Sequence, residues 1–212
     1  SPSNKILEPN AKTLLNSKFS SIKQNQLCIS NKLIKHLLSS LAKVDMNKAE
    51  EQVPNTKGLY LWKNKKNQKY EYIGIATNKD GLKGRIVSKH LKEDYLEGRE
   101  KKHSLTKDRF QLENPIFKKN RPNKKFIDKS AFRKNVGRLL ELCPGKETLA
   151  YIRNYGTFYF YSFEEIEDEH LEAVETILIA SLQPKFNISK KNVPIIYSDK
   201  LSDNFHEIKL KV

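Results

Sequence analysis

The strongest constraint on the fold is a pair of β-prone segments, Gly58–Trp62 and Tyr70–Ile75, joined by the polar run Lys63–Lys69. Both segments are short and rich in aromatic and β-branched residues, and turn-forming residues flank them, which is typical of strands. The short polar connection predicts an antiparallel hairpin. Period-two alternation then places Tyr60 on one face of the first strand and Tyr72 on one face of the second.

Other segments carry the helical period. Apolar residues recur at helical spacing in four places, and an aromatic run after a glycine predicts a third strand. The helices are expected over Asn31–Val44, Leu82–Tyr95 (ended by Gly98), Ser130–Leu142 (capped by Ser130) and Asp168–Leu182, and the strand over Thr157–Phe163. The polar segment 99–129 shows no sustained period and is expected to form loops, with room for one short helix.

These elements predict an α+β fold, a small three-stranded antiparallel sheet flanked by helices, with a basic, mainly helical or irregular insertion. A chain of 212 residues suits one domain with an extension. We expect a helical N-terminal extension over residues 1–53, a main domain over 54–188 with the insertion at about 99–150, and a tail over 189–212.

The positive charge is concentrated in the middle of the chain. The net charge is +15, and residues 54–150 hold 25 basic and 11 acidic residues, whereas residues 151–187 hold 2 basic and 7 acidic ones. Between Arg99 and Arg138 there are 14 basic and 4 acidic residues. Such a density favours a polyanionic partner, with nucleic acid first. A general lysine bias that covers every solvated face is the alternative.

Membrane and secretory classes are not indicated. No stretch approaches the roughly 20 apolar residues of a membrane span, and Ser1–Lys12 has no hydrophobic signal region. Cys28 and Cys143 lack metal-ligand spacing and are expected to be reduced thiols. We therefore expect a soluble protein of the cytoplasm, in contact with the nucleoid if DNA is its partner, and no membrane partner.

Glu175 is the most informative single residue. On a helical wheel it lies within about 60° of Leu171, Leu178 and Leu182. An ionised carboxylate beside an apolar stripe needs a cation, hydrogen bonds or a metal to compensate it, so Glu175 indicates a site. An exposed edge or a salt bridge to an arginine is the structural alternative.

Five elements then occur in a set order: Gly58-Leu59-Tyr60, Tyr72-Ile73-Gly74, Arg85, Glu175 and Pro184-Lys185-Phe186-Asn187. In this order and on these predicted elements they resemble the GIY-YIG nuclease family. A lone tripeptide would be weak, but five ordered elements are specific. The resemblance covers about residues 56–98 and 156–188, and leaves the N-terminal helix, the basic insertion and the tail unexplained.

The resemblance implies a role for each matching residue. Tyr60 looks like the general base, Tyr72 positions water or phosphate, Arg85 clamps the phosphate, Glu175 is the metal ligand and Asn187 braces the site. A single carboxylate completed by phosphate and water oxygens suits Mg²⁺ better than zinc, and Mn²⁺ is the expected substitute. An aromatic cross-strand pair in the core is the alternative reading of the two tyrosines.

One position departs from the family pattern. Many members carry a histidine or tyrosine four positions after the arginine, where this chain has Lys89, with His90 beside it. Lysine can donate to phosphate but is a poor base unless its pKa falls, whereas a histidine can act as acid or base near neutrality. Both residues remain candidates, and a structural or DNA-contacting role for His90 stays open.

The basic insertion separates catalytic elements, since Arg85 and Glu175 are 90 positions apart. Its position predicts a device that recognises duplex DNA and holds it against the metal. Arginine pairs with guanine in the commonest specific contact, although phosphate anchoring by lysines is an equal alternative. The candidate DNA-binding residues are Arg121, Arg133, Lys134, Arg138, Lys101 and Lys102.

Together these features predict a metal-dependent endonuclease that hydrolyses phosphodiester bonds in double-stranded DNA, of the restriction or mobile-element type. A restriction enzyme is expected to form a homodimer to cut both strands, whereas a nicking, repair or homing enzyme could act as a monomer. The competing hypotheses are a catalytically silent nucleic-acid-binding protein that retains the fold, and a structure-specific or RNA nuclease.

Overall fold

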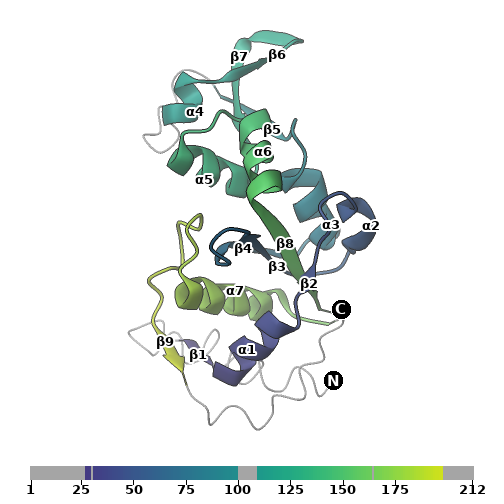
Figure 1. Cartoon of the computed structure of the whole chain (residues 1–212), viewed down its shortest axis with the longest axis vertical. Helices are drawn as coiled ribbons and strands as arrows, with labels where there is room; N and C mark the ends of the chain where they lie inside the picture. The colour runs from purple at the N-terminus through teal and green to yellow at the C-terminus, as the bar shows by residue number, and fades with distance from the viewer. Residues whose placement is uncertain (1–26, 30, 100–108, 164, 198–212) are drawn as a thin grey trace.

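A four-stranded antiparallel sheet forms the centre of the molecule, in the strand order β2-β8-β3-β4 (Figure 1). The computed structural model describes residues 27–29, 31–99, 109–163 and 165–197. The strands of this sheet are β2 (Ala42–Lys43), β3 (Gly58–Asn64), β4 (Tyr70–Ala76) and β8 (Gly156–Ser162). The predicted hairpin and the predicted third strand are therefore present, and the α+β class is confirmed. The two-residue β2 is a fourth strand that the sequence did not predict.

The hairpin register brings Tyr60 of β3 and Tyr72 of β4 close together. Tyr60 lies opposite Gly74, and Trp62 lies opposite Tyr72. A Cβ atom on Gly74 would overlap the Tyr60 hydroxyl, so only glycine leaves room for the Tyr60 ring across the strand pair. The space beside Gly74, where a glycine could let a substrate approach the backbone, is thus filled by Tyr60.

Helices cover both faces of the sheet (Figure 1). One face packs against α1 (Asn31–Ser39) and α7 (Asp168–Leu182), in a core that includes Leu59 and Leu61. The other face, which bears Tyr60 and Trp62, packs against the residues that follow β4 and against two helices of the insertion, α5 (Ala131–Leu140) and α6 (Lys146–Tyr155). The bounds of α7 are those predicted, whereas α6 was not predicted at all.

The first predicted helix is shorter than expected. It ends at Ser39, because the hydroxyls of Ser39 and Ser40 bond the His36 carbonyl and compete with the next helical turn. The chain then joins the sheet as β2, and Val44 N–H donates to the Phe158 carbonyl. The remainder of the N-terminal region includes the short α2 (Ala49–Gln52).

The helix predicted over Leu82–Tyr95 is also shorter and irregular. It consists of α3 (Gly81–Arg85), followed at once by a π-helical turn over Ile86–His90. The chain then forms β5 (Leu96–Arg99), so Gly98 lies inside a strand and does not end the helix.

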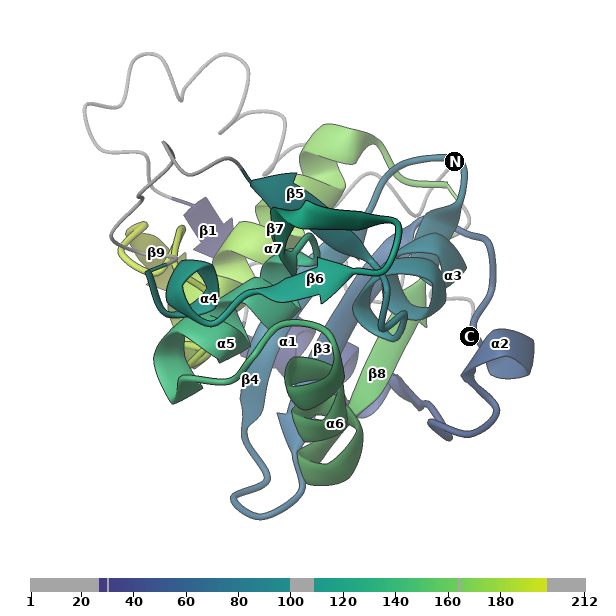
Figure 2. The ribbon, with the colours of Figure 1, turned by 90° about the horizontal axis from the view of Figure 1, so that it is seen from above.

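The insertion contains a second antiparallel sheet, of order β5-β7-β6, which corrects the expectation of a mainly helical or irregular segment. Its further elements are α4 (Arg109–Glu113), β6 (Ile116–Lys118) and β7 (Arg121–Asp128). The sequence of β7 shows no alternation because Arg121–Lys124 are all exposed and include no large apolar side chain, and only Phe126–Asp128 are buried. Figure 2 shows this sheet in front of the central one, at the end of the molecule nearest the viewer.

The N-terminal and C-terminal parts of the described chain meet in a two-stranded parallel pair. Strand β1 (Leu27–Ile29) pairs with β9 (Ile195–Tyr197), so part of the predicted tail adds to the structure. No helix within the described ranges is long and apolar enough to cross a membrane.

Candidate active site

Tyr60, Tyr72 and His90 form one buried aromatic cluster between the hairpin and α5. Their exposed fractions are 3%, 8% and 2%. The Tyr60 hydroxyl lies 2.8 Å from Nε2 of His90, and the rings of Tyr60 and Tyr72 lie 6.3 Å apart between centroids. The ring of Phe132 stacks on Tyr72 at 4.3 Å between centroids, which fixes the ring from the other side. The two tyrosines that the sequence singled out are therefore in contact with a single histidine.

Ser130 links this cluster to the start of α5. Its Oγ accepts the backbone N–H of Arg133 at 3.1 Å and so caps α5 as predicted. The same Oγ lies 2.7 Å from Nδ1 of His90. Burial lowers the pKa of His90 to about 3, helped by the charges of Arg85, Arg133 and Lys89. The neutral ring carries one N–H, so His90 donates to one of Ser130 and Tyr60 and accepts from the other.

The π-helical turn explains why His90, and not Lys89, contacts Tyr60. In this turn the Leu91 N–H donates to the Ile86 carbonyl, five residues back, at 2.9 Å. Because one more residue fits into the turn than in an α-helix, the residue five places after Arg85 faces the site where the fourth would be expected. Lys89 is half-buried and lies near Arg85. Burial lowers the pKa of Lys89, and the charge of Arg85 lowers it further.

Arg85 and Glu175 lie close enough to Tyr60 and Tyr72 to shift the pKa of both phenols. Burial raises the pKa of Tyr60 well above its ordinary value, Tyr72 and Glu175 raise it further, and Arg85 lowers it. The pKa of Tyr72 is raised by burial and by Glu175 and lowered by Arg85. The Nε of Arg85 is buried and has no hydrogen-bond partner in the described part of the chain. A buried donor of this kind favours an anionic ligand.

Glu175 is paired with a cation that the sequence did not suggest. Its Oε1 accepts a hydrogen bond from Nζ of Lys190 at 2.5 Å, and the two side chains are 14% and 33% exposed. Lys190 belongs to the segment that was predicted to be a tail outside the domain, and it has a φ of 67°. No local pattern marks it, because the pairing depends on how the chain turns back after α7.

The residues around Glu175 fit one partly hydrated ion and not a metal cage made by protein alone. Within the described ranges, no group of three or more histidine, cysteine, aspartate or glutamate side chains could hold a metal. Mg²⁺ is commonly held by one or two carboxylates together with substrate phosphate and water. Glu175 supplies the one carboxylate that such a site needs.

Asn187 braces the edge strand. Its Oδ1 accepts the Ile73 N–H at 2.9 Å and its Nδ2 donates to the Ile73 carbonyl at 2.8 Å. The Phe186 N–H donates to the Glu71 carbonyl, and Asn135 of α5 donates to the Phe186 carbonyl. The segment after α7 therefore holds β4 in place next to Tyr72.

Comparison with models of protein families, with curated proteins and with solved structures found no match for this chain. The site is therefore interpreted from its own geometry.

The predicted DNA-binding residues of the insertion have different environments. Arg133 is fully buried, which overturns its assignment to DNA: its Nε donates to Asp128 at 3.0 Å, and its other nitrogens donate to the carbonyls of Lys92, Glu93 and Tyr95. Lys134 pairs with Glu97 at 2.8 Å. Arg138 is partly exposed and donates to Asn135, and Arg121 is exposed on β7. Lys101 and Lys102 lie outside the described residues.

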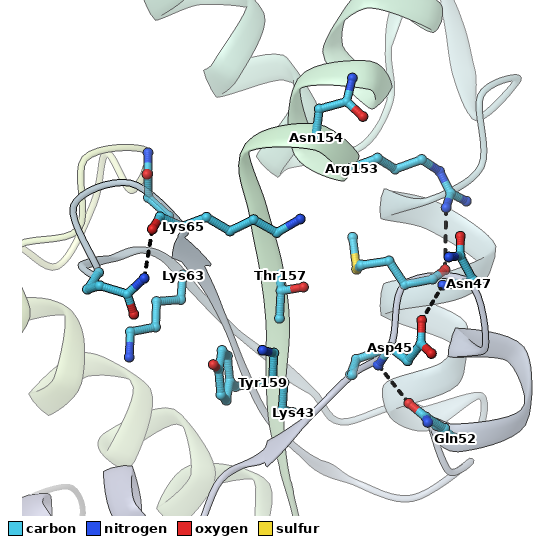
Figure 3. Close-up of a pocket in the computed structure, with 14 residues that line it drawn as sticks. Lys43, Asp45, Asn47, Gln52, Lys63, Lys65, Arg153, Asn154, Thr157 and Tyr159 are labelled. Carbon is cyan, nitrogen blue, oxygen red and sulfur yellow. Dashed lines mark hydrogen bonds between the residues drawn. The ribbon is translucent and has the colours of Figure 1, made fainter.

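A separate polar groove of about 670 Å³ lies beside β8 (Figure 3). Four cations from three parts of the chain line it: Lys43, Lys63, Lys65 and Arg153. Arg153 donates to the Met46 carbonyl, and Lys63 lies over the rings of Tyr70 and Tyr159 at 5.2 and 5.6 Å. None of the residues predicted to act in catalysis lines this groove.

Proposed function

We propose that the protein is a metal-dependent endonuclease of the GIY-YIG type that hydrolyses phosphodiester bonds in double-stranded DNA. One observation carries the proposal. Tyr60 of β3 shares a hydrogen bond with His90 and packs beside Tyr72 of β4, and the charges of Arg85 and Glu175 shift the pKa of both tyrosines. If the two buried tyrosines served only in packing, there would be no reason to place an arginine and a glutamate close enough to shift their pKa.

Arg85 is suited to hold the scissile phosphate. Its buried Nε lacks a partner among the described atoms, and a guanidinium presents donors in a fork that matches phosphate oxygens. A phosphate placed there would satisfy the donor, and the negative charge that develops during attack would be stabilised by a group already in position.

Tyr60 acts as the base that accepts the proton of the attacking water. In the free protein it is a neutral phenol, because burial raises its pKa. The nearby Arg85 charge favours the phenolate when it forms, because it lowers the pKa of Tyr60, and Nε2 of His90 lies at hydrogen-bond distance from the phenol oxygen. Tyr72, whose ring lies beside those of Tyr60 and His90, positions the water or a phosphate oxygen.

Glu175 would hold Mg²⁺, or Mn²⁺ in its place, after Lys190 leaves the carboxylate. The chemistry that such an ion supplies is neutralisation of charge on the phosphate and on the leaving oxygen. Asn187 holds the edge strand β4, and with it Tyr72, in position through its two hydrogen bonds to Ile73.

A restriction or mobile-element enzyme is the setting that accounts for a basic insertion between catalytic elements. A restriction enzyme would act as a homodimer, since each cluster of this kind cuts one strand. A silent binding protein is the competing function, and the close pairing of Glu175 with Lys190 is the observation that favours it.

Cleavage of plasmid and phage DNA tests the proposal. Purified wild type and Glu175→Ala are incubated with each DNA in Mg²⁺, Mn²⁺ or EDTA, and fragment ends are sequenced. Glu172→Ala is the matched control, because Glu172 lies on the same helix but is exposed. We expect discrete metal-dependent fragments from wild type and from Glu172→Ala and none from Glu175→Ala. Binding of DNA by the wild type without cleavage of any DNA would favour the silent protein.

A further inference from the structure

The outer part of β6 and β7 forms a two-stranded ribbon that projects from the insertion. Within the described residues, β5 pairs with β7 from Lys125 to Asp128, and residues 121–124 of β7 continue beyond that pairing. Lys118 pairs with Arg121, which leaves a two-residue turn at the tip. In Figure 1 this ribbon is the outermost element at one end of the long axis of the molecule.

The ribbon is strongly and uniformly basic. Residues 114–127 contain no acidic residue and five basic ones: Lys118, Lys119, Arg121, Lys124 and Lys125. Residues 121–124 are exposed, and none of the ion pairs found in the described part of the chain involves these five cations. Together with Arg99, the ribbon lines a hollow of about 940 Å³ that also includes Phe117, which is 55% exposed.

The base of the ribbon is rigidly attached to the candidate active site. Asp128, at the end of β7, is fully buried and accepts hydrogen bonds from Arg133, Gln111, Gly145 and Thr148. Two residues later, Ser130 bonds His90. Whatever the ribbon binds is therefore held at a fixed position relative to the tyrosine cluster.

From these observations we propose that the β6–β7 ribbon enters the major groove of B-form DNA and recognises bases there. The inference rests on the proposed function for its biological meaning, but concerns binding and not cleavage. An antiparallel two-stranded ribbon fits a B-DNA major groove, which is about 12 Å wide. Arg121 at the tip can pair with guanine, Asn120 and Asn123 with adenine, and Phe117 can contact a thymine methyl group.

The same geometry disfavours RNA. The major groove of an A-form helix is deep and too narrow for side chains to read, so a ribbon cannot enter it. A single-stranded ligand needs aromatic platforms for its bases, and Phe117 is the one exposed aromatic side chain of the ribbon. The lysines would hold the phosphates on either side of the groove.

Binding measured without cleavage tests this inference separately from the proposed function. Full-length protein in EDTA is titrated against a fluorescent 30-base-pair DNA pool and against duplex RNA of the same sequences, over a range of salt concentrations. The ribbon variant carries Lys118→Gln, Lys119→Gln and Lys124→Gln. The control carries Lys65→Gln, Lys66→Gln and Lys69→Gln, three exposed lysines of the β3–β4 hairpin.

We expect the ribbon variant to bind DNA roughly tenfold or more weakly and with a shallower salt dependence, the control to keep most of its affinity, and duplex RNA to bind less well. Selection from a randomised duplex pool should give a motif in which Arg121→Ala relaxes one position. Equal losses in both triple variants, or ribbon-dependent binding of RNA as tight as that of DNA, would overturn the inference. DNA bound through the ribbon but never cleaved would support it and refute the nuclease.

Discussion

The hydroxyl of Tyr60 lies 2.8 Å from Nε2 of His90, although the two residues are 30 positions apart and belong to a strand and to a π-helical turn. Ser130 holds the other ring nitrogen of His90 at 2.7 Å. A hydrogen-bonded chain therefore runs from the N-cap of α5 through His90 to Tyr60, and the ring of Tyr72 packs beside it. Because the neutral imidazole has one N–H, His90 donates to one of its two neighbours and accepts from the other.

Tyr60→Phe should abolish most cleavage while the fold persists. The change removes the proposed proton acceptor, and loss of a general base reduces rates by about 10²-fold or more. It also leaves Nε2 of His90 buried without its hydrogen-bond partner, which costs about 1–3 kcal/mol. Single-turnover cleavage and denaturant unfolding measure the two effects.

Tyr161→Phe is the matched control for that substitution. Tyr161 is buried on the adjacent strand β8, and its hydroxyl is buried with no hydrogen-bond partner in the described part of the chain. Removing this hydroxyl should leave cleavage unchanged and the free energy of unfolding equal or higher. Equal losses of activity in the two variants would show that Tyr60 acts through packing and not through chemistry.

Local patterns were sufficient for part of this structure. The β3–β4 hairpin, β8 and the bounds of α7 follow from period and turn chemistry within about 15 residues. Glu175 was identified because a carboxylate beside an apolar stripe needs compensation. Its partner Lys190 was not, since that contact depends on the backbone turning after α7.

Other features depend on tertiary structure that no local period reports. The π turn that selects His90 over Lys89 is an added residue within an ordinary helical pattern. The ribbon was missed because its outer residues are basic on both faces. Arg133 resembles a surface arginine on a helical wheel, and only the neighbouring carbonyls of residues 92–95 show that it is buried.

The protein should become less stable as the pH falls, because His90 is buried in its neutral form. Its pKa is about 3 in the folded protein, below the ordinary value of 6.5 expected in the unfolded chain. Below pH 6.5 the unfolded chain therefore binds a proton that the folded protein does not, and up to about 1.4 kcal/mol of stability is lost per pH unit down to pH 3. Denaturant unfolding of wild type and His90→Gln between pH 7 and 4.5 measures this: the difference between them should shrink as the pH falls. A constant difference would contradict the prediction.

Ser130→Ala should be more harmful than loss of a cap alone. Removal of an N-cap serine costs about 1 kcal/mol. The variant also removes the hydrogen-bond partner of Nδ1 of His90, so the ring loses one of the two hydrogen bonds that hold it against Tyr60. Cleavage should fall more than stability predicts, and Ser130→Thr should restore both. Retained cleavage in Ser130→Ala would show that the serine acts only as a cap.

Arg133→Met should destabilise the insertion and not act on DNA directly. It leaves Asp128 buried without its cation, and breaking a buried pair costs about 3–5 kcal/mol. Lys134→Met on the same helix removes a partly exposed pair with Glu97, worth about 1 kcal/mol or less. Urea unfolding of both variants distinguishes them. Weaker DNA binding by Arg133→Met with unchanged stability would restore the arginine to the DNA interface.

Lys190→Met should lower the Mg²⁺ concentration needed for cleavage. Nζ of Lys190 lies 2.5 Å from the Glu175 carboxylate, so a cation that binds there must first displace a positive charge. Removing a unit charge at this distance is worth ~1 kcal/mol or more even with solvent screening, so the half-saturating Mg²⁺ concentration should fall by roughly fivefold or more. Lys191→Met controls for the general loss of charge in this segment. If Lys190→Met instead abolishes cleavage at every Mg²⁺ concentration, then Lys190 itself supplies the positive charge at Glu175, and the metal requirement of the site has to be reassigned.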